Sequence, residues 1–363
     1  MTPVHPSSTP HPVPRLIAWE LTRACTLKCR HCRASADTSR STAEFSTAEC
    51  EKVLDNVAAF AKPIIILTGG EPLMRDDIFH LARHGSDLGL RMVLATCGAL
   101  LSEAVCRRLI DAGIQRISLS IDGATARSHD AFRRVDGAFA DAMTAAAHAR
   151  RAGLEFQINT TVSQLNKDEL PEIFNLAIEL GAVSFHPFLL VPTGRGKELA
   201  DYELSPVEYE RVLKWVYDQR GTAPIGLKPT CAPHYYRILR QQEQQRGRRV
   251  TRQTHGLDAM TKGCLGAQGF AFISHVGNVQ MCGFLQETAG NVRECHYDFK
   301  TIWFDSAFFN RIRALDGYHG RCGVCEYQSV CGGCRARAFA MTGDYLAEEP
   351  FCLYRPESMR NAR

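Results

Sequence analysis

Three cysteines lie close together near the N-terminus, at Cys25, Cys29 and Cys32. Their C-x3-C-x2-C spacing follows a strand-like apolar run at residues 16–21, so we expect them on a loop that leaves the end of a strand. Three neighbouring thiolates suit an iron–sulfur cluster, and a four-iron cluster with three protein ligands leaves one iron open. Structural zinc needs four ligands, and His31 is poorly placed to be the fourth.

A second set of seven cysteines lies in the C-terminal part of the chain. Its members are Cys264, Cys282, Cys322, Cys325, Cys331, Cys334 and Cys352. Repeated C-x2-C pairs are also typical of zinc ribbons, so a zinc protein without catalysis remains an alternative. The sequence has 15 cysteines in all, and Cys50, Cys97, Cys106 and Cys295 have no predicted role.

Composition and charge limit the classes of protein to consider. The 363 residues carry a formal net charge of +4, which gives no general case for nucleic-acid binding, and 45% are hydrophobic. No apolar run approaches the ~18–20 residues of a membrane helix, and the N-terminus lacks a signal peptide. We therefore expect a cytoplasmic protein with neither membrane nor nucleic-acid partners. In that compartment many cysteines indicate metal or redox chemistry rather than disulfides.

Strand-like and helical patterns alternate over the first part of the chain. Strand-like runs lie at 16–21, 64–67, 92–95, 117–121, 156–162 and 183–188, with helical patterns at 46–60, 77–88, 102–112, 138–152 and 168–180. The continuously apolar run at 64–67 predicts a strand buried on both faces. Ser46 and Glu49 predict a capping box at the first helix. The alternation indicates an α/β fold with a parallel sheet and right-handed crossovers.

The composition also divides the chain into segments. Residues 1–14 are Pro/Ser-rich and predict a disordered tail, and residues 15–225 form the alternating α/β domain. Residues 205–252 look helical, and residues 226–263 form a basic helical connector whose charges we interpret as a solvated face. Residues 264–356, rich in Gly and Cys, predict a second domain held by metal sites rather than by a large core, and residues 357–363 a second tail.

A second chemical motif, Gly69-Gly70-Glu71-Pro72, directly follows the apolar run at 64–67. Glycines at a strand end let the backbone approach a ligand closely, and a carboxylate there can accept hydrogen bonds from an ammonium group. Together with the cysteine triplet, this motif resembles the radical S-adenosylmethionine (SAM) superfamily. The resemblance implies a partial (β/α)6 barrel in which the three N-terminal cysteines hold a [4Fe–4S] cluster whose open iron binds SAM.

The resemblance also implies that SAM lies at the C-terminal ends of the strands. The Gly-Gly-Glu-Pro motif would bind the methionine amino group, although Glu71 has an alternative as an N-terminal helix charge. The other residues implied to line SAM are Thr96, Ser118, Ser120, Asp122, Arg133, Asn159 and Thr161. Polar residues at strand ends can equally be caps.

The C-terminal cysteines resemble the SPASM extension, which houses up to two auxiliary [4Fe–4S] clusters. By position, the resemblance assigns the outer cluster to Cys322, Cys325, Cys331 and Cys352, and the inner cluster to Cys264, Cys282 and Cys334. The inner cluster is then one thiolate short. Cys231 is the candidate fourth ligand, and an open iron or a non-cysteine ligand is the alternative. The expected cofactors are therefore three [4Fe–4S] clusters and SAM.

Segments at 184–189, 194–198, 231–237, 331–338 and 342–349 resemble the tetrapyrrole-modifying branch of the superfamily. The resemblance implies oxidative decarboxylation of two propionates of Fe-coproporphyrin III to vinyl groups, giving haem b. Didecarboxysirohaem deacetylation and haem d1 maturation are alternatives within the branch, and peptide maturation by a radical SAM/SPASM enzyme is an alternative outside it. The expected partner is a low-potential electron donor such as ferredoxin or flavodoxin.

Binding of propionates requires cations, and the guanidinium group pairs bidentately with carboxylate. The candidates are Arg195, Lys228, Arg237, Arg335 and Arg337. For Arg335 and Arg337 a structural role in the cluster domain is the alternative. His186 and His234 are candidate ligands of the porphyrin iron, with Tyr235 in the same site, although a lone His is more often a satisfied polar residue.

Overall fold

The computed structural model describes residues 11–360, which build one ten-stranded sheet in the order β10-β9-β8-β1-β2-β3-β4-β5-β6-β7. Neighbouring strands from β8 through β1 to β7 run parallel, and β9 and β10 are antiparallel additions at one edge. The strands are β1 (Leu16–Glu20), β2 (Ile64–Thr68), β3 (Arg91–Thr96), β4 (Ile114–Ser120), β5 (Phe156–Val162), β6 (Ser184–Leu189), β7 (Gly226–Leu227), β8 (Phe270–Ile273), β9 (Asn278–Cys282) and β10 (Leu285–Asn291).

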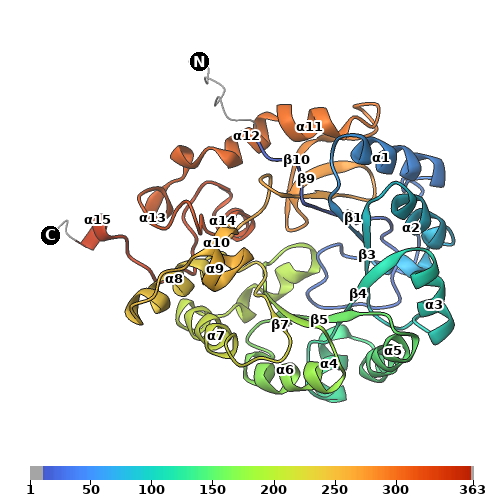
Figure 1. Ribbon diagram of the computed structural model, residues 1–363, viewed down its shortest axis with the longest axis horizontal. Coiled ribbons are helices and arrows are strands. Elements are labelled where there is room, and N and C mark those ends of the chain that lie inside the picture. Colours follow the sequence, from blue (N-terminus) through green and yellow to red (C-terminus); the bar gives the residue numbers. More distant parts are fainter. Residues whose placement is uncertain (1–10, 361–363) are drawn as a thin grey trace.

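Helices cover the outside of this curved sheet (Figure 1). The α-helices are α1 (Thr47–Phe60), α2 (Ile78–Asp87), α3 (Glu103–Asp111), α4 (Ala126–Arg133), α5 (Ala138–Ala152), α6 (Leu170–Glu179), α7 (Pro206–Gln219), α8 (Tyr235–Gln245), α9 (Arg252–His255), α10 (Leu257–Met260), α11 (Phe299–Asp305), α12 (Ala307–Arg313), α13 (Gly320–Gly323), α14 (Arg335–Thr342) and α15 (Glu357–Arg360). Four 3-10 turns are η1 (Pro72–Met74), η2 (Lys167–Glu169), η3 (Gly194–Tyr202) and η4 (Leu315–Gly317).

The predicted alternation of strands and helices is confirmed, and its boundaries hold to within a few residues. Helix α1 begins at the predicted capping box, in which Ser46 and Glu49 each accept a hydrogen bond from the other's main-chain N–H. Helix α4 has no counterpart in the sequence pattern, because its eight residues carry only two buried non-charged side chains, His129 and Phe132. The result is an open parallel α/β sheet that resembles a partial barrel.

One expectation about the strands is wrong. Strand β2 is not buried on both faces, because Ile64 and Ile66 are only partly covered while Ile65 and Leu67 are buried. Strands β4 and β5 alternate in the same way, with buried apolar residues toward the helices and partly exposed residues on the opposite face. The inner face of the open sheet therefore carries polar side chains that a ligand can reach.

The expectation that the C-terminal region lacks a large core is also wrong. Strand β8 pairs in parallel with β1, so the sheet continues across the predicted boundary at residue 264. Phe299, Trp303 and Phe309 are fully buried and belong to the same apolar core as Val53 and Leu54 of α1. The C-terminal cysteines are thus mounted on elements that share the core of the barrel.

The predicted connector and tails are partly structured. The helical region expected at 205–252 is interrupted by β7, since Gly221, Pro224 and Pro229 disfavour a continuous helix. Residues 1–10 and 361–363 of the predicted tails lie outside the described residues, whereas the Pro12 carbonyl accepts a hydrogen bond from the Trp303 indole (3.0 Å). Within residues 11–360 no helix is both long and apolar enough to cross a membrane.

A shared core predicts that the barrel and the C-terminal region unfold together. Phe309→Ala should lower the free energy of unfolding by about 3–5 kcal/mol, as expected for deletion of a buried aromatic ring. Urea unfolding followed by far-UV circular dichroism should show one transition that moves as a whole. Val324→Ala is the control, because Val324 is 54% exposed and its loss should change stability by less than about 0.5 kcal/mol. A second transition unaffected by Phe309→Ala would contradict the shared core.

Candidate functional site

The three N-terminal cysteines lie together on the loop between β1 and α1. Cys25 and Cys29 are buried, Cys32 is partly exposed, and all three belong to one small apolar cluster that also contains Leu27 and Ala36. The main-chain N–H of Leu27 donates to Cys25 Sγ (3.4 Å), and that of Ala36 donates to Cys32 Sγ (3.4 Å). Such donors stabilise thiolates, as the sulfur ligands of an iron–sulfur cluster require.

Gly69 and Gly70 press this cysteine loop against the end of β2. The Gly70 N–H donates to the Thr22 carbonyl (2.7 Å), and the Glu71 N–H donates to the Ala24 carbonyl (2.7 Å). A Cβ on Gly69 would lie 2.4 Å from the Thr22 oxygen, and one on Gly70 would lie 2.2 Å from the Ala24 oxygen. Only glycine permits this approach, so the motif positions the residues that lead into Cys25.

The Glu71 side chain is fully buried and binds the protein itself. Its carboxylate accepts hydrogen bonds from Thr96 Oγ1 (2.8 Å), the Cys97 N–H (2.8 Å) and the Leu73 N–H (3.0 Å). Burial raises the pKa of Glu71 despite these donors. Glu71 therefore caps the turn η1, which was its alternative role, and joins the end of β2 to the end of β3. Thr96, predicted to line SAM, is also buried in this contact.

The sequence placed Cys97 at the end of a strand but assigned it no role. This residue packs against the apolar cluster of the three cysteines, and its Sγ lies 3.8 Å from Thr26 Oγ1. A hydrogen bond with Cys97 lowers the pKa of Cys25 to about 7. The only sequence signal was the place of Cys97 directly after a strand, at the same edge of the sheet as the other strand-end residues.

A buried ion pair joins the cysteine loop to the ends of β4 and β5. Arg133 lies 2.5 Å from the Asp122 carboxylate and donates to Cys29 Sγ (3.5 Å), while Asp122 also accepts from the Thr161 N–H (2.7 Å). Burial would raise the pKa of Asp122, but Arg133, His31 and His129 hold it below its ordinary value. The structure thus brings together three predicted SAM-lining residues and one predicted cluster ligand.

His31 is not directed at the cysteines. Its Nε2 lies 3.8 Å from Asp122, and its ring packs on Phe132 with centroids 4.7 Å apart. Burial lowers the pKa of His31 to about 4, so the ring is neutral at physiological pH. The buried His31 Nδ1 has no hydrogen-bond partner, which leaves one polar atom available beside the cysteine loop.

The remaining residues predicted to line SAM share the inner face of the sheet. Ser120 of β4 is in register with Asn159 of β5, and Asn159 is in register with His186 of β6. Ser118 lies two residues before Ser120, and Thr161 lies two residues after Asn159, so both are on the same face of the sheet. All these side chains are partly exposed. The register therefore brings together strand-end residues that are far apart in sequence.

The four cysteines predicted for the outer cluster line a single pocket. Cys322, Cys325, Cys331 and Cys352 surround about 440 Å³ of empty space, part of it open to solvent. The Gly333 N–H donates to Cys331 Sγ (3.4 Å), and the Glu349 N–H donates to Cys322 Sγ (3.3 Å). Among the described residues, no three His, Cys, Asp or Glu side chains converge closely enough to hold a single metal ion.

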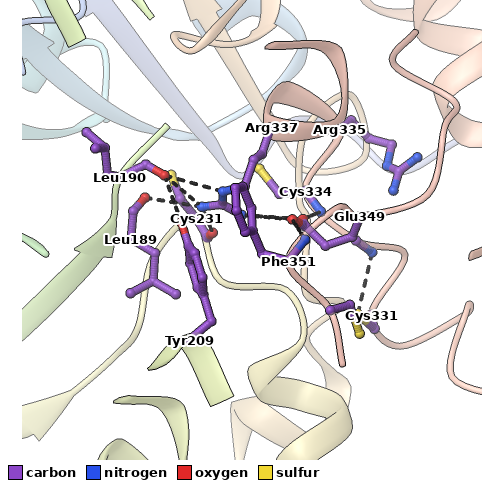
Figure 2. Close-up of polar contacts among 12 residues, drawn as sticks. Leu189, Leu190, Tyr209, Cys231, Cys331, Cys334, Arg335, Arg337, Glu349 and Phe351 are labelled. Carbon is purple, nitrogen blue, oxygen red and sulfur yellow. Dashed lines mark hydrogen bonds and ion pairs between the residues drawn. The ribbon is translucent and has the colours of Figure 1, made fainter. Parts of the chain in front are cut away.

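The cysteines predicted for the inner cluster also face one another. Burial, followed by Cys334 and Cys282, raises the pKa of the Cys231 thiol well above its ordinary value, and burial raises that of Cys282 to about 12. Cys231 adopts a left-handed conformation (φ 55°), and its carbonyl accepts a hydrogen bond from Arg337 (3.0 Å; Figure 2). A non-glycine residue held with φ above zero indicates that the surroundings impose this turn.

Most of the predicted substrate-binding arginines are instead bound within the protein. Arg337 is fully buried and reaches Glu349 (3.3 Å) and the carbonyls of Leu189 and Leu190 (Figure 2). Arg335 and Arg237 are also buried, and both point toward the outer cysteines. Arg237 and Arg335 each retain an unpaired Nε, but both of these atoms are buried in this structure.

Arg195 also serves the cysteine loop. Its guanidinium donates to the carbonyls of Cys29 (3.0 Å) and Ala36 (2.6 Å), and its main-chain N–H donates to the Cys32 carbonyl (3.0 Å). One Arg195 nitrogen remains buried without a partner. The segment after β6 is thereby tied to the cysteine loop.

The other predicted substrate residues differ in accessibility. Lys228 keeps an exposed surface, although the protein around its ammonium group displaces part of the water and lowers its pKa. His186 lies on the inner face of the sheet. Its Nδ1 is 3.2 Å from the Gln157 amide nitrogen and its Nε2 is 2.9 Å from the Ser184 hydroxyl. Burial, and then the charge of Lys228, lower the pKa of His186 to about 3. His234 and Tyr235 are buried without hydrogen-bond partners, and His234 lines the outer cysteine pocket.

Comparison with known proteins agrees with this geometry. Residues 19–177 match the family model of the Radical SAM superfamily. The chain is 52% identical over 343 residues to the AdoMet-dependent heme synthase of Methanosarcina barkeri, which covers 94% of this chain and 97% of that protein. It is 31% identical over 356 residues to the Pre-heme d1 synthase of Dinoroseobacter shibae, which covers 95% and 86% respectively.

A solved structure shares the fold. Streptococcus suis SuiB bound to S-adenosylmethionine matches with a TM-score of 0.74 over 94% of this chain and 77% of that chain, at 18% identity. The chain belongs to the radical SAM superfamily. Within that superfamily, it is an enzyme of tetrapyrrole metabolism. Membership implies a SAM-binding [4Fe–4S] cluster, and three clustered cysteines with N–H donors on their sulfurs fit that group.

The close contact at Gly70 predicts the effect of a small substitution. Gly70→Ala should displace the cysteine loop, because the added Cβ would overlap the Ala24 carbonyl. We expect SAM affinity to fall roughly tenfold or more, which is about 1.4 kcal/mol, together with loss of the iron held by the first three cysteines. Iron analysis and SAM titration under anaerobic conditions measure both. Gly221→Ala is the control, since a Cβ there meets nothing within 4 Å. Equal effects of the two substitutions would refute a positioning role.

Proposed function

We propose that this protein oxidatively decarboxylates two propionate side chains of Fe-coproporphyrin III to vinyl groups, giving haem b. The observation that carries the proposal is the 52% identity, over nearly the full length of both chains, to a protein named AdoMet-dependent heme synthase. The partly exposed polar inner face of the sheet, next to the cysteine loop, supports a bound organic substrate.

The radical cluster and SAM supply hydrogen-atom abstraction from an unactivated C–H bond, which no side chain can perform. The chain's own residues position these groups. Cys25, Cys29 and Cys32 would hold the cluster, and the Gly69–Gly70 contact holds their loop. Ser120 and Asn159 would contact SAM from the inner face. The buried Arg133–Asp122 pair keeps this edge of the site in place.

The C-terminal cysteines would hold two auxiliary [4Fe–4S] clusters of SPASM type. The shared pocket of Cys322, Cys325, Cys331 and Cys352 supports the outer site. After burial, Cys334, Cys282 and Cys264 each raise the pKa of the Cys231 thiol, and this closeness of the four sulfurs supports the inner site. Each decarboxylation releases one electron from the substrate, and these clusters are its proposed acceptors.

For the substrate carboxylates, we assign Lys228 as the cationic partner. It is an exposed cation near His186 on the inner face, whereas the predicted arginines are bound within the protein. His186 can reach the porphyrin iron only by breaking its contact with Gln157 or Ser184. We further propose a cytoplasmic enzyme that takes electrons from ferredoxin or flavodoxin.

Haem d1 maturation is the second candidate function, favoured by the 31% identity to a protein named Pre-heme d1 synthase. Didecarboxysirohaem deacetylation belongs to the same branch. Deacetylation differs chemically from the proposed reaction. Removal of an acetate forms no vinyl group and releases no electron that needs an acceptor.

Product masses separate these candidates. With reconstituted enzyme, SAM, a reductant and Fe-coproporphyrin III, the product mass should fall in two steps, each by carbon dioxide plus two hydrogens. A monovinyl intermediate should appear, and each step should consume one SAM. Cys25→Ala is the control and should release no 5′-deoxyadenosine. Turnover of didecarboxysirohaem with an inert Fe-coproporphyrin III would replace the proposal by the deacetylase function.

The assignment of Cys231 to the inner cluster makes a separate prediction. Cys231→Ala should alter or remove the electron paramagnetic resonance (EPR) signal of that cluster and leave SAM binding intact, because Cys231 does not belong to the side-chain cluster that contains Cys25, Cys29 and Cys32. Cys295→Ala is a matched control, since Cys295 is partly exposed and has no predicted ligand role. An unchanged iron content and spectrum in Cys231→Ala would mean that Cys231 is an ordinary buried thiol.

A further inference from the structure

The outer cysteine pocket is the only one of the three cysteine sites, within the described residues, whose sulfurs contact two arginines. Arg335 donates to Cys322 Sγ (3.7 Å), and Arg237 donates to Cys352 Sγ (3.9 Å). The main-chain N–H groups of Gly333 and Glu349 donate to Cys331 and Cys322. Two cationic and two neutral donors therefore point at this set of sulfurs.

The charge of these arginines is only partly neutralised. Arg237 binds Glu210 through two hydrogen bonds (2.9 and 2.6 Å). Arg335 donates to the carbonyls of Ala347 (2.6 Å) and Tyr345 (3.2 Å), and within residues 11–360 no carboxylate lies within ion-pair distance of it. Glu349 also lines the pocket, but its ion pair is with Arg337 rather than with either of these two arginines.

The inner cysteine site has a compensated cation. Arg337 is its buried arginine, but the donors of Arg337 reach the Cys231 carbonyl rather than a sulfur. Glu349 (3.3 Å) and Glu203 (3.9 Å) lie on either side of the Arg337 guanidinium. Glu349 pairs with the cation beside the inner site, whereas burial raises the pKa of Glu203 to about 7.

The N-terminal cysteine site is compensated as well. Arg133 reaches Cys29 Sγ, but it is paired with the buried Asp122 at 2.5 Å. The buried Glu71 carboxylate also lies at this site, where it accepts the Cys97 N–H. Arg195 binds carbonyls of the same loop and donates to no cysteine sulfur. Among the described residues, the outer site is therefore the one at which two guanidinium groups donate to sulfurs.

Hydrogen bonds to the sulfurs and nearby charge set the reduction potential of an iron–sulfur cluster. An added electron makes a cluster more negative, and a cation in a poorly screened site favours that state. We propose that Arg237 and Arg335 give the outer site the highest reduction potential of the three. An electron that enters the C-terminal clusters would then be held mainly by the outer cluster. This inference rests on the proposed function and concerns its electron exit.

The electron balance of the step is simple. After a hydrogen atom has been removed from the propionate β-carbon, the bond to the carboxylate breaks, a vinyl group forms, and carbon dioxide and one electron leave. The electron reduces the outer cluster by one unit. An oxidised one-electron carrier protein must then remove it before the second propionate is processed, and the pocket's opening to solvent permits such an approach.

The test is an EPR-monitored redox titration of the full-length, reconstituted protein. The outer cluster is identified as the signal lost in Cys352→Ser. In Arg335→Gln its reduced-to-oxidised ratio at a fixed potential should fall at least tenfold, which is about 59 mV for one electron. Arg335→Lys should restore most of the shift, because it keeps the charge. Arg240→Gln is the control, since Arg240 lies on α8 with Arg237 but donates only to the Tyr236 and Ala259 carbonyls.

The outcomes are decisive. If the outer signal does not have the highest potential, or if Arg335→Gln leaves it unchanged, the inference is wrong while the proposed function stands. If Arg335→Gln loses the outer iron, Arg237→Gln must lower the same potential, and an unchanged value there overturns the inference. If the double variant Cys322→Ala/Cys352→Ala binds as much iron as the unsubstituted protein, no outer cluster exists and the cluster assignment in the proposed function fails as well.

Discussion

The site depends on one main-chain contact, in which the turn after β2 docks on the loop after β1. Two hydrogen bonds, from Gly70 to Thr22 and from Glu71 to Ala24, fix the backbone just before Cys25. The approach is so close that neither Gly69 nor Gly70 can carry a Cβ. Since Glu71 also holds the ends of β2 and β3 together, a single turn orders the cysteine loop and the strand ends that surround it.

Buried arginines extend this order to the rest of the molecule. Arg195 binds carbonyls of the cysteine loop, and Arg337 binds carbonyls at the end of β6 together with that of Cys231. Arginine suits this task because its planar group carries five donors and stays charged when buried. Several arginines that composition alone offers as substrate ligands therefore act as fixed parts of the scaffold. The inner face of the sheet carries side chains that are not bound in this way, such as Lys228.

The C-terminal region is continuous with the barrel in both backbone and core. Strand β8 extends the sheet beyond β1, and Phe299, Trp303 and Phe309 pack into the same core as α1. The cysteines of the C-terminal region consequently lie on β9, α13 and the loops of a region that shares its core with the barrel. Their position relative to the cysteine loop is also fixed by the segment after β6, where Thr193 binds the Phe284 carbonyl and Arg195 binds that of Cys29.

Local patterns in the sequence determined the cysteine triplet, the Gly-Gly-Glu-Pro turn and six of the strands with most of their helices, because periodicity, caps and glycines act over a few residues. Asn159 and Ser120 were recognisable as strand-end residues for the same reason. Only the tertiary structure decided that Cys97 lies beside Cys25, that Cys231 faces Cys282 and Cys334, and that Arg335 points at a sulfur. These contacts join residues tens to more than a hundred positions apart, and no local signal records them. An arginine whose guanidinium is buried against carbonyls and one that is free to bind a substrate look the same in the sequence. Only the packing of the folded chain distinguishes them.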